Sequence, residues 1–203
     1  MCPNYLVKSF KVCVGVLNRK ETQDAQCFES STFYAHPNYA CCSTDNSKDI
    51  AIIKIKEGID LPKFTSDGRG STNAICLPPA SDAEKDYSGQ AIIAGFGRTD
   101  SNSNDIAKTL QIGTVKLLST SECQQSYGAF SVDKTHVCAF SDDTSSCNGD
   151  SGSALYTENN YGVKTAIGVT SFGRINCKGN PVVYTKVAAY RDFIDKYSGS
   201  SNN

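Results

Sequence analysis

The stretch Cys147-Asn148-Gly149-Asp150-Ser151-Gly152-Ser153 is the most informative part of this sequence. A serine hydroxyl is a poor nucleophile unless a base takes its proton and fixed donors receive the developing oxyanion. A glycine two residues before a serine lets the backbone turn so that both amide N–H groups point at one spot. Gly149 and Ser151 are therefore candidates for an oxyanion hole, with Ser151 as the nucleophile. A polar surface turn is the competing interpretation, because Gly, Asp, Ser and Asn are the usual turn formers.

The composition argues against several classes of function. The chain has 203 residues, of which 39% are hydrophobic, so it is long enough to bury a core. Its formal net charge of −1 argues against binding to nucleic acid or to an anionic membrane. No apolar run approaches the length that spans a bilayer. We therefore expect a globular, monomeric protein without a nucleic-acid or membrane partner.

Ten cysteines in a chain of this size indicate an oxidising compartment and a disulfide framework. Zinc binding is the alternative, but there is no C-x-x-C pair, and the two histidines, His36 and His136, lie far apart. We expect no metal and no organic cofactor. The cysteines predict a secreted, extracellular protein, although the sequence does not open with a signal peptide. This combination suggests that an N-terminal segment is missing.

Short β-rich runs recur between clusters of turn-forming residues, which is typical of an all-β protein. Apolar residues at helical spacing predict a closing helix near the C-terminus, and a shorter helix is expected at 119–127 with Ser119 or Ser121 as its cap. The predicted strands lie at 11–17, 50–55, 90–94, 110–118, 153–156, 163–172 and 181–187.

Several further segments resemble landmarks of one protein family, in that family's order. They are His36-Pro37-Asn38-Tyr39, Asp49-Ile50-Ala51-Ile52-Ile53, Ile75-Cys76-Leu77-Pro78, Ala94-Gly95-Phe96-Gly97, Gly149-Asp150-Ser151-Gly152, Ser171-Phe172-Gly173 and Tyr184-Thr185-Lys186-Val187. Together they resemble the chymotrypsin/trypsin-like serine proteases over essentially the whole chain. The resemblance implies two six-stranded antiparallel β-barrels and a C-terminal helix, with the N-terminal barrel incomplete. We expect a single peptidase domain over 1–203, divided into a partial barrel at 1–89, a complete barrel at 90–187 and a helix at 188–198.

The resemblance also assigns roles to residues of the cleft. Asp49 would orient a catalytic histidine, Ser151 would attack the peptide carbonyl, and Gly149 and Ser151 would donate to the oxyanion. Ser171 would hydrogen-bond near the aspartate. In this family the residue matching Asp150 pairs with the N-terminal amine that zymogen cleavage creates.

Five residues are expected to bind the substrate side chain. The resemblance places Ser145 on the floor of the specificity pocket, where a serine cannot select a basic side chain by charge. Gly173 would keep one wall open, while Val182 would narrow the pocket, so we expect small or medium apolar side chains. The expected substrate-binding residues are Ser145, Ser171, Phe172, Gly173 and Val182.

The resemblance implies disulfides Cys123–Cys138 and Cys147–Cys177. It gives Cys2 and Cys76 partners upstream of this chain. The pairing of the remaining four cysteines stays open, although adjacent residues are poor partners for each other; these four are Cys13, Cys27, Cys41 and Cys42.

One part of the family pattern is missing. The family's catalytic histidine immediately precedes the cysteine that matches Cys2, and here that position is Met1. Two hypotheses follow. The first is a serine endopeptidase that acts on protein or peptide substrates, with protease inhibitors as further partners, and that is inactive as this truncated chain. The second is a secreted pseudoprotease that serves as a binding or decoy module.

Overall fold

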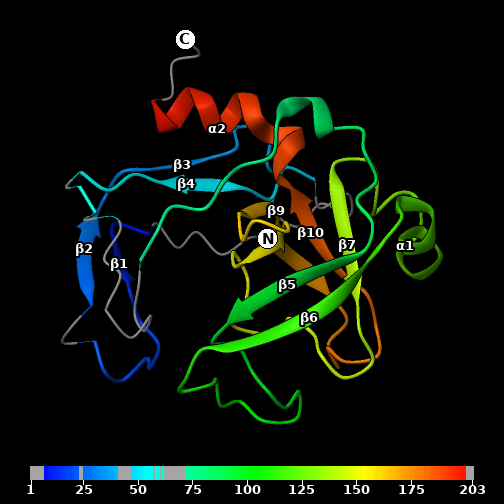
Figure 1. Ribbon diagram of the computed structural model, residues 1–203, viewed down its shortest axis with the longest axis horizontal. Helices are drawn as coiled ribbons and strands as arrows, with labels where there is room; N and C mark the ends of the chain where they lie inside the picture. The colour runs from blue at the N-terminus through cyan, green and yellow to red at the C-terminus, as the bar shows by residue number, and fades with distance from the viewer. Residues whose placement is uncertain are drawn as a thin grey trace.

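The computed structural model describes residues 7–22, 25–40, 47–56, 58–59, 61 and 72–199. Its central feature is a closed six-stranded antiparallel barrel in the order β10-β7-β6-β5-β8-β9 (Figure 1). The strands are β5 Gln90–Gly95, β6 Gln111–Leu118, β7 His136–Phe140, β8 Ala154–Glu158, β9 Lys164–Gly173 and β10 Val182–Lys186. The protein is therefore mostly β, as the sequence predicts.

Apolar side chains from every strand fill the interior of this barrel. Alternation on β6 illustrates the reason, because Val115 and Leu117 are buried while Thr114 and Lys116 are exposed. The buried cluster consists of Ala91, Ile93, Val115, Leu117, Val137, Ala139, Leu155, Ile167, Val182 and Tyr184.

Strand β7 was not among the predicted strands. Its first four residues are all buried, so it shows no alternation between apolar and polar positions. The strand pairs with β6 on one side and β10 on the other, which covers both of its edges. Both of its faces are also covered, because Val137 and Ala139 belong to the barrel core and Cys138 to a second buried cluster with Cys123 and Val132.

The described N-terminal part holds two small antiparallel sheets that lie to one side of the barrel (Figure 1). Strand β1 (Phe10–Val14) pairs with β2 (Gln26–Ser30), and β3 (Phe33–Ala35) pairs with β4 (Ala51–Ile53). The sequence predicted β1 and β4 but missed the short strands β2 and β3. That these strands belong to an incomplete second barrel stays a prediction.

Two helices and two 3₁₀ turns complete the described elements. Helix α1 (Thr120–Tyr127) begins at a capping box, in which Ser119 and Glu122 satisfy each other's backbone N–H groups. The terminal helix starts as the 3₁₀ turn η2 (Val187–Tyr190) and continues as α2 (Arg191–Ser198). The other turn is η1 (Ala80–Asp82).

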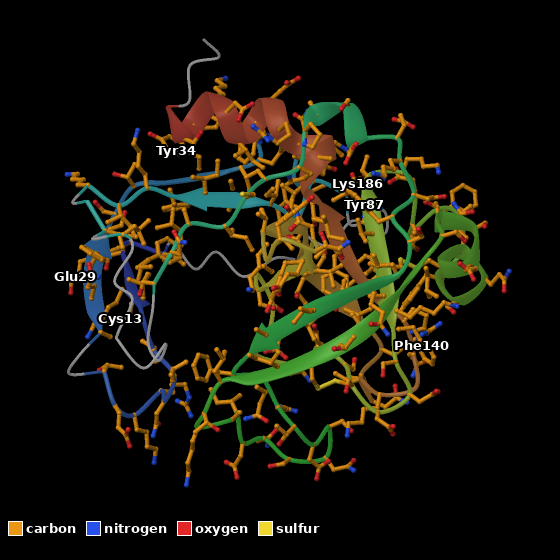
Figure 2. The ribbon with its side chains drawn as sticks, in the orientation of Figure 1. Cys13, Glu29, Tyr34, Tyr87, Phe140 and Lys186 are labelled. Atoms are coloured by element: carbon orange, nitrogen blue, oxygen red, sulfur yellow. A yellow bond between two sulfur atoms is a disulfide. The ribbon has the colours of Figure 1, made fainter. Side chains whose placement is uncertain are left out.

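Helix α2 packs on the sheet formed by β3 and β4, as Figure 1 shows. Tyr34 of β3 stacks on Tyr197 of α2 with 4.3 Å between ring centroids (Figure 2). Ile50, Tyr190 and Phe193 form the buried centre of this contact. The helix thereby positions residues 49–50, which lead into β4.

In the part of the chain that the structure describes, no helix has the length and apolarity needed to cross a membrane.

Candidate active site

Asp49 is held at the end of the barrel by two hydroxyl groups. The Ser171 Oγ donates to Asp49 Oδ2 at 2.7 Å, and the Thr185 Oγ1 donates to the backbone carbonyl of Asp49 at 2.8 Å. Ser171 belongs to β9 and Thr185 to β10, so two barrel strands position this aspartate. Ile50, the next residue, is buried and anchors the segment from the other side.

The turn that carries Ser151 is tied to β9. The Gly152 N–H donates to the Thr170 carbonyl, and the Thr170 N–H donates to the Ser153 carbonyl. The side-chain hydroxyls of Ser153 and Thr170 also lie 3.0 Å apart. These bonds fix the backbone on the C-terminal side of Ser151, whose own side chain is exposed. The Cys147–Cys177 disulfide fixes the other side.

Gly149 and Ser151 offer two free backbone donors beside the candidate nucleophile. Neither of their N–H groups donates a hydrogen bond within the described residues. Gly149 has φ of 101°, and a Cβ there would lie 3.1 Å from the Gly97 Cα and 3.2 Å from the Ile106 Cγ2. Only glycine fits this conformation and this space. Two unbonded N–H groups, one on Ser151 itself and one on the glycine two residues before it, are the kind of donors that receive an oxyanion.

Asp150 points away from the cleft and holds two turns together. Its Oδ1 accepts from the Gly97 N–H at 2.7 Å, and its Oδ2 accepts from the Cys147 N–H at 3.0 Å. A Cβ on Gly95 or Gly97 would overlap this carboxylate. The requirement for glycine in Ala94-Gly95-Phe96-Gly97 thus has a physical cause. Pairing of Asp150 with an N-terminal amine stays a prediction.

A cavity of about 220 Å³ opens next to Ser151. Phe172, Gly173 and Val182 contribute to its walls, and Ser171 joins it to Asp49. That these residues bind a substrate side chain stays a prediction. A Cβ on Gly173 would lie 3.6 Å from Val182 Cγ2, which shows how closely the two walls face each other. The branched Val182 side chain therefore limits the cross-section of the cavity.

The resemblance places Ser145 on the floor of the specificity pocket. Its hydroxyl donates to the carbonyls of Ser146 and Cys177, and the residue lines a different cavity, of about 460 Å³, behind Asp150. Ser146 lines the cavity beside Ser151 instead, with its Oγ 2.9 Å from the buried Tyr184 Oη. The assignment of Ser145 to the floor of the specificity pocket stays a prediction.

Phe172 has supporting contacts that the sequence analysis missed. The Tyr127 ring meets it edge-on at 5.5 Å, and the buried His136 ring lies 6.2 Å from it. The Arg174 guanidinium lies over the Tyr127 ring at 5.2 Å from its centroid and donates to the Ser126 carbonyl. In the sequence, the apolar residues around His136 indicate burial, but they do not indicate which aromatic ring His136 contacts.

Each histidine contacts residues outside the candidate active site. His36 packs against Tyr190 and Phe193, and burial followed by the Lys48 charge lowers its pKa below the usual value. His136 Nδ1 lies 2.9 Å from the Asp133 carboxylate. Neither imidazole contacts Asp49 or Ser151 within the described residues. In the same part of the chain, no three His, Cys, Asp or Glu side chains are grouped closely enough to bind a metal.

The disulfides of the described residues are Cys13–Cys27, Cys123–Cys138 and Cys147–Cys177. The last two are the pairs that the resemblance implies, and the first resolves part of the pairing that the sequence left open. Cys76 is exposed and forms no disulfide with another cysteine of the described residues. Cys2, Cys41, Cys42 and Met1 lie outside the described residues.

Comparison with known proteins identifies the family. The model of the trypsin family matches residues 2–194, which is nearly the whole chain. The chain belongs to the trypsin family.

Individual relatives agree with this assignment. The chain is 30% identical to the fibrinolytic enzyme isozyme C of Lumbricus rubellus over 200 residues, which cover 93% of this chain and 78% of the relative. It is 32% identical to chymotrypsin-C of Rattus norvegicus over 199 residues, covering 93% and 70%. It is 34% identical to melanization protease 1 of Drosophila melanogaster over 172 residues, covering 79% and 40%.

Trypsin family members are serine endopeptidases that act on protein substrates. This activity requires a nucleophile, donors for an oxyanion and a pocket for one substrate side chain. The arrangement around Ser151 contains a candidate for each of these parts.

Proposed function

We propose that this chain carries the nucleophile, the oxyanion hole and the aspartate of a secreted serine endopeptidase. The observation that supports this most directly is the 2.7 Å hydrogen bond between Ser171 and Asp49, because Ser171 also lines the cavity that contains Ser151. The aspartate, the serine and a side-chain pocket thus meet at one place, from segments far apart in the sequence.

The reaction follows from this arrangement. The Ser151 Oγ forms a bond to the substrate carbonyl carbon while a histidine imidazole takes its proton. The N–H groups of Gly149 and Ser151 donate to the resulting oxyanion. The carbon–nitrogen bond then breaks as the imidazole returns the proton to the leaving amine, and water hydrolyses the acyl-enzyme. Asp49 keeps the imidazole in the orientation and tautomer that accept the serine proton.

We further propose that the 203-residue polypeptide alone is a poor endopeptidase. Its two histidines contact neither Asp49 nor Ser151 among the described residues, and the family pattern places the catalytic histidine at Met1. Loss of one triad member reduces turnover by a factor on the order of a million in a comparable triad. The base has to be supplied by a histidine before Cys2.

The shape of the pocket supports a preference for small or medium apolar side chains at the cleaved bond. Val182 narrows the cavity opposite Gly173, and Ser146, whose Oγ lies 2.9 Å from the Tyr184 Oη, contributes a neutral polar group to its lining. No carboxylate lines the cavity to pair with a basic side chain within the described residues. Substrates with Ala or Val at this position are expected to react faster than those with Arg.

A non-catalytic binding module is the second candidate function. The absence of an imidazole beside Asp49 in the described residues is the observation that favours it. Such a protein would bind extended peptides along the same cleft without cleaving them. The two functions share a binding site and differ only in whether a histidine is present to act as the catalytic base.

The decisive experiment restores the base and measures serine reactivity. The chain with Met1→His, produced behind an N-terminal carrier, is compared with the Met1→Ala chain. A fluorophosphonate probe and a peptide ester with Ala at the cleaved position report reaction. We expect labelling of Ser151 and ester hydrolysis only with the histidine, and loss of both on adding Ser151→Ala.

A second control tests the role of Asp49. Adding Asp49→Asn to the Met1→His chain should lower turnover by about 10⁴-fold, because the imidazole then holds the wrong tautomer. Failure of the Met1→His chain to react, together with retained peptide binding, would exclude the endopeptidase and support the binding module. Fast hydrolysis by the unaltered chain would contradict the proposed need for an added histidine.

A further inference from the structure

The peptide bond between Asn148 and Gly149 has an unusual chemical liability. Asn148 is the only asparagine of the sequence that is followed by glycine. An asparagine side chain can be attacked at its Cγ by the backbone nitrogen of the next residue, and a Cβ on that residue hinders the approach. Glycine removes this hindrance and gives the backbone the freedom to reach the required geometry.

The local structure leaves both reacting groups available. Asn148 is exposed, and its side chain makes no hydrogen bond to the described residues. The Gly149 N–H, which must lose its proton to attack, donates no hydrogen bond in the same part of the chain. Only the Asn148 carbonyl is engaged, as the acceptor of the Arg98 N–H at 2.9 Å.

Two other exposed asparagines provide a comparison within the same molecule. Asn102 is followed by Ser103, whose N–H donates to the Asp100 carbonyl at 3.2 Å. Asn104 is followed by Asp105, whose N–H donates to the Ser103 Oγ at 3.0 Å. In both cases the attacking nitrogen is hydrogen-bonded and its residue carries a Cβ. Asn148 lacks both forms of protection.

Gly149 cannot be replaced by another residue to prevent this reaction without disturbing the local structure. Gly149 has φ of 101°, and a Cβ there would be 3.1 Å from the backbone of Gly97. The absence of a side chain and the unbonded N–H are the same properties that qualify Gly149 as an oxyanion donor. The feature that suits the site for catalysis therefore exposes it to this reaction.

We propose that Asn148–Gly149 is a site of spontaneous deamidation that modifies the oxyanion hole. The Gly149 nitrogen forms a bond to Asn148 Cγ, the Cγ–Nδ2 bond breaks, and ammonia leaves with the proton that the Gly149 nitrogen lost. Water then opens the cyclic imide at either carbonyl, which gives aspartate or isoaspartate at position 148. No oxidant, enzyme or metal takes part.

Each product changes the donor pair of Gly149 and Ser151. The imide has no N–H on Gly149, and isoaspartate adds a methylene to the main chain, which moves that N–H relative to Ser151. Aspartate places a negative charge beside the position where the oxyanion forms, which disfavours it. This consequence rests on the proposed endopeptidase function, whereas the modification itself does not.

The chemical test uses the full chain and needs no activity. The protein is incubated at neutral and at mildly alkaline pH, and peptide mapping by mass spectrometry follows conversion at each asparagine. Isoaspartyl methyltransferase labelling identifies the isomerised product. We expect Asn148 to react at least an order of magnitude faster than Asn102, and faster at higher pH because the attacking nitrogen must be deprotonated.

Two comparisons make the result decisive. The reduced, urea-unfolded chain gives the rate set by the local sequence alone, and Asn148→Gln shows which signals depend on the five-membered imide. A folded-state rate at Asn148 within a few-fold of the unfolded rate supports the proposal. Complete protection of Asn148 in the folded chain, while the unfolded chain converts, overturns it.

The consequence for the oxyanion hole has a separate readout. Fresh and aged Met1→His chains are compared for fluorophosphonate labelling of Ser151, and the labelled fraction is related to the extent of conversion at position 148. Labelling that falls in proportion to conversion supports the proposed effect, and labelling that does not change overturns it. Conversion at Asn148 without any labelling of fresh protein contradicts the endopeptidase function and leaves the modification site standing.

Discussion

Gly149 shows how one residue type can be required for two separate reasons. Its φ of 101° lies in a region that residues with a Cβ rarely adopt, and the space a Cβ would need is taken by Gly97 and Ile106. The sequence motif indicates the first reason, because glycine before the serine suggests a turn. The second reason depends on a loop some 50 residues earlier in the chain, which only the structure brings into contact.

Replacing this glycine separates backbone strain from crowding. Gly149→Ala should destabilise the protein by about 2 kcal/mol or more, since it adds left-handed strain of about 1–2 kcal/mol and a close contact. Gly89→Ala is the matched control, because Gly89 has φ of 89° with nothing within 4 Å of its Cβ position. Urea unfolding measures both. Equal losses for the two variants would mean that contact with Gly97 and Ile106 has no effect.

At the scale of single elements, helix α1 is stabilised by an interaction that its sequence predicts. Ser119 caps the helix and accepts from the Glu122 N–H, while Glu122 accepts from the Ser119 N–H at 2.7 Å. Hydrogen bonds from the Ser119 side chain and backbone lower the pKa of Glu122, so its contribution is lost as the pH falls through that lowered pKa.

Removal of the cap should weaken the helix measurably. Ser119→Ala is expected to lower the free energy of unfolding by about 1 kcal/mol, because one backbone N–H loses its acceptor. Ser121→Ala is the control, since that hydroxyl lies in the same turn without capping the helix. Chemical denaturation at neutral pH distinguishes the two. A cost for Ser121→Ala as large as that for Ser119→Ala would rule out the cap as the cause.

Tyr184 of strand β10 and the nearby Tyr87 both have raised pKa values. Burial raises the pKa of Tyr184 to about 12, with a smaller contribution from the charge of Asp150. The same effect of burial, together with the charge of Asp82, raises the pKa of Tyr87 to about 12. Lys186, at the end of β10, lies beside Tyr87 and donates to the carbonyls of Ala83 and Lys85 (Figure 2).

These tyrosines predict loss of stability in alkali. A group whose pKa is raised on folding stabilises the protein below its unfolded pKa, and this contribution disappears as the pH rises through the folded pKa. Between about pH 10 and about pH 12 the free energy of unfolding should therefore fall, by up to about 1.4 kcal/mol per pH unit for Tyr184. Tyr184→Phe should flatten this slope, whereas Tyr161→Phe, at an exposed position, should leave it unchanged. Identical slopes in all three proteins would contradict the prediction.

For the whole molecule, the three disulfides of the described residues differ mainly in their burial. Cys123 of α1 and Cys138 of β7 are 0% and 2% exposed, in a buried cluster with Val132 and Val183. Cys27 is exposed on the small β1–β2 sheet, where its partner Cys13 lies directly opposite it. Cys13–Cys27 and Cys123–Cys138 close loops of similar length, with separations of 14 and 15 residues. Access to a reducing thiol is then the main difference between them.

Reduction of the native protein should therefore follow a fixed order. Under limiting dithiothreitol, Cys13–Cys27 should be reduced first and Cys123–Cys138 only when the barrel unfolds. Differential alkylation followed by peptide mass mapping measures the order. In urea the two bonds should be reduced at similar rates, which serves as the control. Early reduction of Cys123–Cys138 without urea would show that the barrel opens more readily than its burial indicates.

The sequence by itself determined the residues whose chemistry or conformation is local. The glycines of the turns, the serine of the motif, the cap of α1 and the alternating strands of the barrel could all be predicted from the chain. Strand β7 could not, because both of its faces are buried: Val137 and Ala139 face the barrel core, and Cys138 belongs to a second buried cluster with Cys123 and Val132, so the alternation that would reveal the strand is lost.

Only the tertiary structure decided which side chains meet at the candidate site. Asp49 and Ser171 are 122 residues apart in sequence, yet their side chains share a hydrogen bond. Ser145 and Ser146 are adjacent and chemically identical, yet Ser146, whose hydroxyl is hydrogen-bonded to Tyr184, lines the cavity beside Ser151, while Ser145 lines the other. Which of the two serines faces a given cavity depends on the strands that surround them. Local sequence carries no information about those strands.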